Sequence, residues 1–379
     1  MDAVRQHRVI VALAAVGLFG VVFFGPRTQV AADTLPRRLT DRAFWQMVTD
    51  FSEPNGFFRS DNFISNELAF QQVIPDLKKR IAPGGVYLGV GPDQNFTYIT
   101  SFQPRLAFIV DIRRQNMLQH LMYKALIEMS DDRADFLSHL FSRPRPAGLV
   151  KSSAPQALFD AYNESAPSEA LYQINLRAIM DRLVKRHGFS LTDEDRVSLE
   201  YVYRAFYTDG PGLRYSFPRQ GNARWFPTYT DLMTETDLAG NNHSYMATEE
   251  NFRILRDVER NNLIVPIVGD FGGDKALRAV GSYLKEHGAT VTFFYTSNVE
   301  QYLFQSDAWQ RFYANVATLP IDTTSTFIRS YFNIGFQFPA PNFNTTIRSE
   351  TLLEPISDAV GAYRTDQFHN YLDVIERSR

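Results

Sequence analysis

Two glycines and an aspartate have the spacing of a nucleoside-binding turn. Gly89 and Gly91 follow the short apolar run 86–88, and Asp111 ends a second apolar run that begins at Leu106. Glycines let a backbone turn tightly beside a ligand, and an acid at the end of the next strand can bind the two hydroxyls of a ribose. The interval from Gly91 to Asp111 is 20 residues, close to the roughly 20 expected of such a pair. The pattern predicts a strand–helix–strand unit that binds a nucleoside.

The residue at the end of the turn argues against a dinucleotide. Turns that bind NAD or FAD have a small residue at the sixth position of the motif, where the helix packs closely against the strand. Gln94 occupies that position here, and its side chain would hold the helix away from the strand and crowd a pyrophosphate. An ordinary α/β turn beside a solvated aspartate is the alternative that these residues leave open.

The Gly-x-Gly-Pro turn, with a following strand that ends in Asp, resembles the class I S-adenosylmethionine-dependent methyltransferases. In that superfamily the turn lies against the methionine part of the cofactor, and the acid binds the ribose hydroxyls. The resemblance covers about half of the chain, residues 41–130 and 250–335. It implies a Rossmann-like sheet, S-adenosylmethionine as the cofactor, and a first set of cofactor-binding residues: Gly89, Gly91, Pro92, Asp93, Asn95, Asp111, Ile112 and Arg113.

The turn departs from that superfamily at two positions. Tyr87 stands two residues before the first glycine, where an acid is usual, and Asp93 stands where a third glycine is usual. The turn together with a large helical insertion is also similar to uncharacterised bacterial proteins, and that similarity implies no substrate.

Two apolar runs in the last third of the chain predict a second parallel unit. Residues 263–268 and 289–295 read as strands, and the amphipathic segment 275–287 between them reads as a helix. This order implies a parallel crossover, and ligands of open parallel sheets bind at the carboxyl ends of the strands. We therefore expect one shared edge for Gly89, Asp111, Asp270, Ser297 and Asn298. The methyltransferase resemblance implies that Asp270 and Phe271 lie near the adenine, and that Ser297 and Asn298 face the transferred methyl group.

Methyl transfer from a sulfonium needs few catalytic groups. The reaction is a direct displacement, so the protein mainly aligns the reactants and in some cases removes a proton. We expect the base or orienting group among His243, Glu249 and Asn298. The first two stand near Tyr229 and Asp231 in a polar part of the chain. A histidine in such a place is more often a satisfied surface or core residue, which is the alternative for His243.

No metal site is predicted. Asp231, Glu235 and Asp237 offer carboxylates at close spacing, but such spacing is common in proteins. The chain also lacks a phosphate-binding Gly-x-x-x-x-Gly-Lys loop, a His-Glu-x-x-His pair and a Gly-x-Ser-x-Gly turn. The motifs therefore give no support for an ATPase, a zinc protease or a serine hydrolase.

Composition places the chain among globular proteins. Of its 379 residues, 44% are hydrophobic and 21% are charged, which is too apolar for a disordered chain. The formal net charge of −3 offers no basic surface for nucleic acid. The absence of cysteine excludes disulfides, cysteine-bound metals and thiol nucleophiles. We expect a small-molecule ligand, and the composition predicts no oligomeric state.

The apolar segment 9–24 predicts a signal peptide or a membrane anchor. It is preceded by Arg5 and Arg8, and the small residues 30–32 resemble a cleavage site. The basic residues on its two sides do not decide the orientation. An exported domain would lack S-adenosylmethionine, which is made in the cytosol. A non-catalytic nucleoside-binding or scaffold protein, exported or anchored, is therefore the alternative to a methyltransferase.

Four segments follow from these patterns. Residues 1–32 form the signal peptide or anchor, 33–130 hold N-terminal helices and the first half of the sheet domain, 131–250 form a largely helical insertion, and 251–379 complete the sheet and end in helices. Asp41 is expected to cap a first helix, and a second one over 65–79 contains Pro75. Further helices are expected over 113–129, 352–363 and 367–375, and a strand over 327–332. A polar group before the glycine turn either rims the ligand site or caps helices: Ser60, Asp61, Asn62, Asn66 and Glu67.

Overall fold

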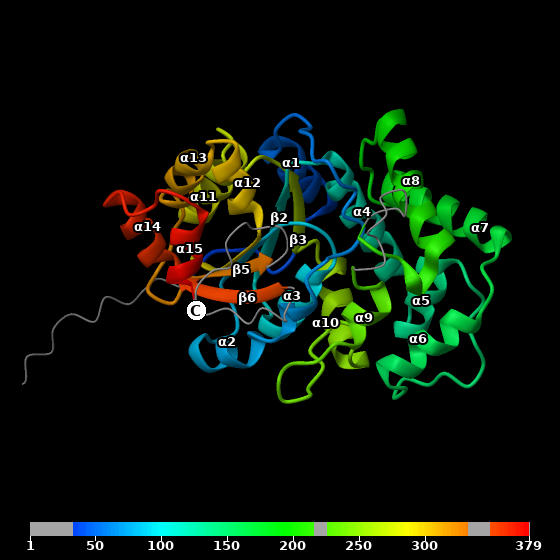
Figure 1. Ribbon diagram of the computed structural model, residues 1–379. Coiled ribbons are helices and arrows are strands. Elements are labelled where there is room, and N and C mark those ends of the chain that lie inside the picture. Colours follow the sequence, from blue (N-terminus) through cyan, green and yellow to red (C-terminus); the bar gives the residue numbers. More distant parts are fainter. Residues whose placement is uncertain (1–32, 216–225, 333–348, 379) are drawn as a thin grey trace, which may run out of the picture. The chain divides into compact units, whose positions relative to one another are not determined.

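The computed structural model describes residues 33–215, 226–332 and 349–378. The predicted signal peptide or anchor at 1–32 lies outside the described residues. Within the described parts of the chain, no helix is both long and apolar enough to cross a membrane. Figure 1 labels the helices and strands discussed below.

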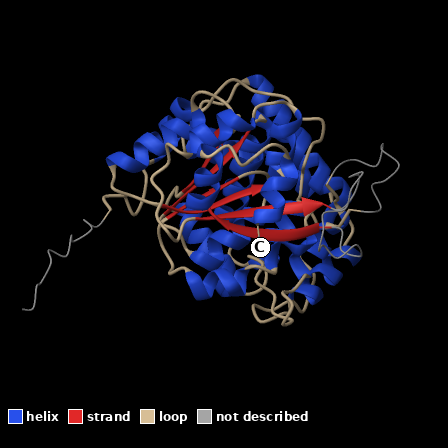
Figure 2. Cartoon of the chain, turned by 60° about the vertical axis from the view of Figure 1, so that its left-hand side comes forward, coloured by secondary structure: helices blue, strands red, loops and turns tan. Residues whose placement is uncertain are grey.

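Six strands form one sheet, which helices enclose (Figure 2). The strands are Val86–Gly89 (β1), Leu106–Asp111 (β2), Ile264–Val268 (β3), Val291–Ser297 (β4), Thr326–Phe332 (β5) and Ser349–Pro355 (β6). Their order in the sheet is β3-β2-β1-β4-β5-β6. Every neighbouring pair is parallel except β5 and β6, which are antiparallel. The predicted α/β class with a mostly parallel sheet is confirmed.

Strands β1, β2 and β3 are almost entirely apolar because helices cover both faces of the sheet. All residues of β1, β2 and β3 are buried. The pairing also extends the strands past their apolar runs: Gly89 pairs with Ile109, and Asp111 pairs with Val268. Gly89 and Asp111 are thus the last residues of their strands, and the pairing of the sheet fixes their positions.

Helices of the sheet domain fall into two contacting groups. In one group, Gln94–Phe102 (α3) and Arg114–Met129 (α4) both contact Glu249–Arg260 (α10), and α3 also contacts Ile74–Arg80 (α2). In the other, Ala276–Glu286 (α11) contacts both Asp41–Phe51 (α1) and Trp309–Val316 (α13). The remaining C-terminal helices are Val299–Gln305 (α12), Ile356–Arg364 (α14) and Tyr371–Arg377 (α15).

The segment 131–250 is largely helical where it is described. It contains Arg133–Phe141 (α5), Pro155–Glu164 (α6), Glu169–Met180 (α7), Asp193–Asp209 (α8) and Tyr229–Thr234 (α9), with a π-helical turn at Asp181–Arg186. Helices α5, α7 and α8 contact α4, which is buried through most of its length. The green helices of Figure 1 therefore cover α4 rather than the sheet itself.

Several predicted elements have different bounds. The helix expected over 65–79 is a short 3-10 turn, Leu68–Gln71, followed by α2, and Pro75 lies in the first turn of α2, where a proline has no bond to break. The first helix is capped by the Thr40 hydroxyl, which accepts from the Ala43 amide at 3.1 Å, and not by Asp41. Thr248 caps α10, and its hydroxyl accepts from the Asn251 amide.

The prediction of a helix over 352–363 was wrong for its first four residues. Residues through Pro355 form β6, in which Leu353 pairs with Ile328 of β5, and the helix begins only at Ile356. Residues 333–348, which join the two strands in the sequence, lie outside the described range. The pattern of residues 352–355 alone did not indicate that they pair with β5. Pairing with β5 supplies the backbone hydrogen bonds that a helix would otherwise have made.

Candidate functional site

A cavity of about 510 Å³ lies at the carboxyl ends of the parallel strands. Its walls come from the residues after β1, β2, β3 and β4, from residues 57–67 and from α12. This volume is in the range of small-molecule and cofactor sites. Sheet order reverses between β1 and β4, because the chain adds β2 and β3 on one side and β4 and β5 on the other. Ligands of open α/β sheets bind at such a reversal.

Most of the residues predicted to bind the cofactor or take part in catalysis line the cavity: Gly91, Pro92, Asp111, Ile112, Arg113, Asp270, Phe271, Ser297 and Asn298. They come from four separate strand ends. Parallel pairing explains the convergence, because it places the carboxyl ends of neighbouring strands at the same edge of the sheet.

Gly89 and Asn95 lie behind the turn and do not line the cavity. A Cβ on Gly89 would lie 2.0 Å from the Asn95 Oδ1, so glycine is required by close packing. Asn95 Nδ2 donates to the carbonyls of Val90, Gly91 and Pro92 at 2.9, 3.2 and 2.7 Å, and its Oδ1 accepts from the Tyr87 hydroxyl at 2.8 Å. Asn95 therefore holds the shape of the turn from inside.

Asp93 also points away from the cavity, toward the insertion. It is buried, and its Oδ2 accepts from the Tyr245 hydroxyl at 2.8 Å. Burial raises the pKa of Asp93 to about 7, against the opposing effect of that hydrogen bond. The place where a third glycine was expected is thus a buried acid that joins the turn to residues just before α10.

His120 of α4 supports the turn from another side. Its Nε2 lies 2.9 Å from the Gly91 carbonyl oxygen, and burial lowers the pKa of His120 to about 4. The imidazole is therefore neutral, with its proton on Nε2 donated to Gly91. Gly91 itself has φ of +78°, a conformation that favours glycine.

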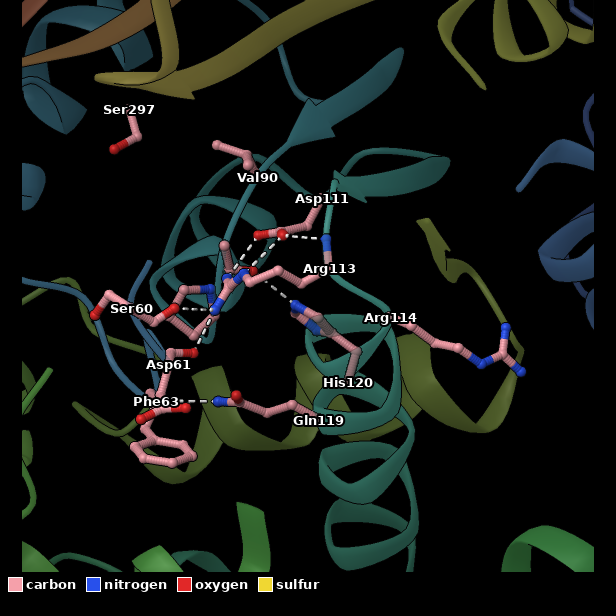
Figure 3. Close-up of polar contacts among 12 residues, drawn as sticks. Ser60, Asp61, Phe63, Val90, Asp111, Arg113, Arg114, Gln119, His120 and Ser297 are labelled. Atoms are coloured by element: carbon pink, nitrogen blue, oxygen red, sulfur yellow. Dashed lines mark hydrogen bonds and ion pairs between the residues drawn. The ribbon is translucent and has the colours of Figure 1, made fainter. Parts of the chain in front are cut away.

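Asp111 reaches the cavity but is held by Arg113. The guanidinium donates to the two carboxylate oxygens at 3.0 and 2.8 Å, and the Arg113 amide donates at 2.9 Å. Arg113 also donates to the carbonyls of Ser60 and Asp61, and its guanidinium lies 5.9 Å from the Phe58 ring. Figure 3 shows Arg113 between Asp111 and the backbone of Ser60 and Asp61. Arg113 thus fastens residues 58–61 to the end of β2.

The loop after β3 is held from outside the cavity by Glu53. The Glu53 carboxylate accepts from the amides of Asp270, Lys275 and Ala276 at 2.8–2.9 Å. Asp270 Oδ1 accepts from the Gly272 amide at 2.8 Å, and the Phe271 ring stacks on Phe312. The acid and the aromatic ring that were expected near an adenine are therefore held rigidly.

The far end of the cavity contains an acid for which the sequence predicted no specific role. Glu67 is buried and lines the cavity, and three hydroxyls donate to its carboxylate: Ser297, Ser330 and, at 2.6 Å, Tyr295. Burial raises the pKa of Glu67, and the three hydrogen bonds oppose the rise. Glu67 belongs to the polar group expected before the glycine turn. Its partners lie more than two hundred residues away, so no local signal marked it.

Two of the three expected catalytic residues lie outside the cavity lining. His243 Nε2 lies 2.7 Å from the Asp237 carboxylate, and Glu249 binds the buried Arg133 at 2.9 Å. Asn298 does line the cavity. Nearby, the Tyr229 hydroxyl is bonded to that of Tyr245.

The acids considered as metal ligands have other partners. Asp231 forms the capping box of α9, Glu235 Oε1 accepts from the Thr236 amide, and Asp237 binds His243 and Asn241. Among the residues that the structure describes, no group of three His, Asp or Glu side chains could hold a metal ion. The carboxylates instead stabilise turns and the end of a helix.

The match to one sequence family covers all six strands and most of the residues that line the cavity. The family model "Domain of unknown function (DUF7790)" matches residues 62–373. The chain belongs to this family. The match begins in the segment that carries Glu67 and ends in α15, so it includes the glycine turn, the insertion and the whole sheet. No curated protein matches the chain.

Proposed function

We propose that the cavity binds S-adenosylmethionine and that the protein transfers its methyl group to a small-molecule acceptor. The observation that carries this proposal is the meeting of Gly91, Asp111 and Ser297 in one cavity where the strand order reverses. The order β3-β2-β1-β4-β5-β6 corresponds to that of a doubly wound, Rossmann-like sheet, apart from the antiparallel β6.

Asp111 keeps room for a ribose hydroxyl although Arg113 binds it. A carboxylate offers about four acceptor positions. Arg113 uses both positions of Oδ1 and one of Oδ2. The second position of Oδ2 remains for a ligand donor from the cavity. The ion pair also fixes the direction of the Asp111 carboxylate, which favours binding of a ligand without reorganisation.

The charge of the cavity suits a sulfonium. Its described lining has three carboxyl groups, Glu67, Asp111 and Asp270, and one cationic side chain, Arg113. Arg113 is paired with Asp111, so the lining retains negative charge. A cationic cofactor gains attraction in such a place, because opposite charges interact more strongly in a partly buried site than in water.

Calorimetry on the full chain tests the proposal directly. Wild type is expected to bind S-adenosylmethionine, and Asp111→Asn, which keeps the shape of the side chain, is expected to bind at least about tenfold more weakly through the loss of a charge-assisted hydrogen bond. Asp50→Asn changes an exposed acid of α1 and serves as the matched control. The proposal fails if wild type gives no binding heat, or if Asp111→Asn binds as tightly as Asp50→Asn.

The ion pair between Asp111 and Arg113 favours one second candidate, a non-catalytic nucleoside-binding protein. An acid already satisfied by an arginine can serve binding without turnover. Formation of S-adenosylhomocysteine from bound S-adenosylmethionine, in the presence of a cell extract as acceptor source, separates the two functions. Methyl transfer further requires the domain to face the cytosol, where the cofactor is held, and we propose that orientation. Protection of the domain from protease added to whole cells checks it.

A further inference from the structure

The acids at the two ends of the cavity have different hydrogen-bond and ion-pair partners. Along the sheet, Asp270 follows β3, Asp111 ends β2, Gly91 follows β1 and Ser297 ends β4. Glu67 is bonded to β4 and β5, and so lies at the end opposite Asp270. In Figure 3, Val90 separates Ser297 from Asp111. If the nucleoside occupies the end with Asp111 and Asp270, Glu67 lies beyond the methyl group, where the acceptor must be.

Glu67 has hydroxyl partners and no cationic partner within the described residues. Its donors are Ser297, Tyr295 and Ser330, and the one cationic side chain of the described lining, Arg113, binds Asp111. A buried carboxylate is costly unless a positive group pairs with it. Hydroxyl bonds orient the carboxylate and lower its basicity, but they do not neutralise it. A cation that enters the cavity would supply this missing partner.

We propose that the acceptor is an amine and that Glu67 binds its nitrogen as positive charge develops there. This inference rests on the proposed function. The lone pair of the neutral amine attacks the methyl carbon, a carbon–nitrogen bond forms, and the carbon–sulfur bond breaks with its electron pair passing to sulfur. The products are a thioether and a methylated ammonium that retains its proton. Positive charge thus moves from sulfur to nitrogen, and a fixed carboxylate beside the nitrogen stabilises the transition state.

Other acceptor classes fit this end of the cavity less well. A carboxylate or phosphate acceptor would be repelled by Glu67. An alcohol must lose its proton during transfer, and three hydroxyl donors already occupy most of the acceptor positions of the Glu67 carboxylate. An amine needs no base. It needs a negative group that stabilises the positively charged transition state more than the neutral reactant.

Two nucleosides test the charge at this position without knowledge of the acceptor. Sinefungin carries a protonated amine where S-adenosylmethionine carries its methylsulfonium, and S-adenosylhomocysteine carries neither group. We expect wild type to bind sinefungin about tenfold or more tightly than S-adenosylhomocysteine, and we expect Glu67→Gln to lose that preference. Glu286→Gln, an exposed position in α11, is the matched control and should keep it. If wild type binds neither nucleoside, the proposed function is overturned. If wild type binds both nucleosides with equal affinity, only this inference is overturned.

A measurement on wild type alone covers the case in which Glu67→Gln does not fold. Burial raises the pKa of Glu67, so protonation at lower pH should reduce the preference for sinefungin. The titratable groups that face Glu67 are the tyrosines of β1, α3, β4 and α15, and burial raises their pKa values far enough to keep them neutral: Tyr87, Tyr98, Tyr295 and Tyr371. A preference that stays constant as pH falls to about 4, near the pKa of a glutamate side chain in water, overturns the inference.

Discussion

The guanidinium of Arg113 and the carboxylate of Asp111 form a buried ion pair inside the candidate site, with hydrogen bonds of 3.0 and 2.8 Å. The same guanidinium donates to the carbonyls of Ser60 and Asp61. One side chain thereby links the acid expected to bind a ribose to the segment that closes one wall of the cavity. Stability and ligand binding are coupled at this pair.

Removal of Arg113 should destabilise the fold strongly. Arg113→Met leaves the Asp111 carboxylate buried without its partner, and the expected cost in the free energy of unfolding is about 3–5 kcal/mol. The double variant Asp111→Asn/Arg113→Met removes the isolated charge and should recover part of this loss. Urea denaturation measures both, with Arg311→Met on the exposed side of α13 as control. A single-variant cost no larger than that of the control would contradict the pairing.

Asn95 should be essential for the glycine turn although it does not face the cavity. Asn95→Ala deprives three backbone carbonyls of a donor, and at about 1 kcal/mol for each bond the expected cost is about 2–4 kcal/mol. Asn163→Ala, at an exposed position in α6, should change the free energy of unfolding by no more than about 0.5 kcal/mol. Thermal and urea unfolding compare the two variants, and equal stabilities would exclude the bracing role.

Two glycines should respond to alanine in opposite directions. A Cβ at Gly89 would meet Asn95 at 2.0 Å inside a packed region, so Gly89→Ala should destabilise by about 1–3 kcal/mol. A Cβ at Gly361, within α14, meets nothing within 4 Å, and Gly361→Ala should stabilise by about 0.5–1 kcal/mol through helix propensity. Denaturant midpoints give the sign of each change, and the same sign for both would refute the packing argument.

Asp93 should make stability fall as pH rises. Burial raises its pKa from 3.8 to about 7, so the protonated form is favoured in the folded state. That contribution is fully present below the unfolded pKa and is lost as pH rises through about 7, with a slope of up to about 1.4 kcal/mol per pH unit. Because Glu259, with its pKa raised to about 8, adds a similar dependence, the quantity to measure is the difference between wild type and Asp93→Asn.

That difference should grow in favour of Asp93→Asn between about pH 4 and pH 7, where the unfolded wild-type chain has lost a proton that the folded state retains, and it should level off above about pH 8. Urea unfolding across this pH range gives the result. Parallel pH curves for the two proteins would show that the pKa of Asp93 is not raised in the folded state.

The strands and the turn were predictable because they depend on short stretches of sequence. Apolar runs bounded by glycine and polar residues located β1 to β5 within one or two residues at most ends. Parallel crossovers then predicted one shared edge for Gly89, Asp111, Asp270, Ser297 and Asn298, and all of these except Gly89 line the cavity. The β6 strand was not recognised, because its partner β5 lies beyond a long intervening segment and its own residues suit a helix equally well.

The sequence by itself determined the α/β class, the helical insertion, and the edge of the sheet where the cavity lies, since hydrophobic periodicity and turn residues carry that information locally. Only the tertiary structure decided which side chains serve the site. In the folded protein Asn95 and Asp93 point away from the cavity, and Asp111 is paired with Arg113. His243 and Glu249 lie outside the cavity lining. The tertiary structure also joined Glu67 to Ser330, 263 residues away, because contacts between such distant residues arise from the packing of the whole sheet.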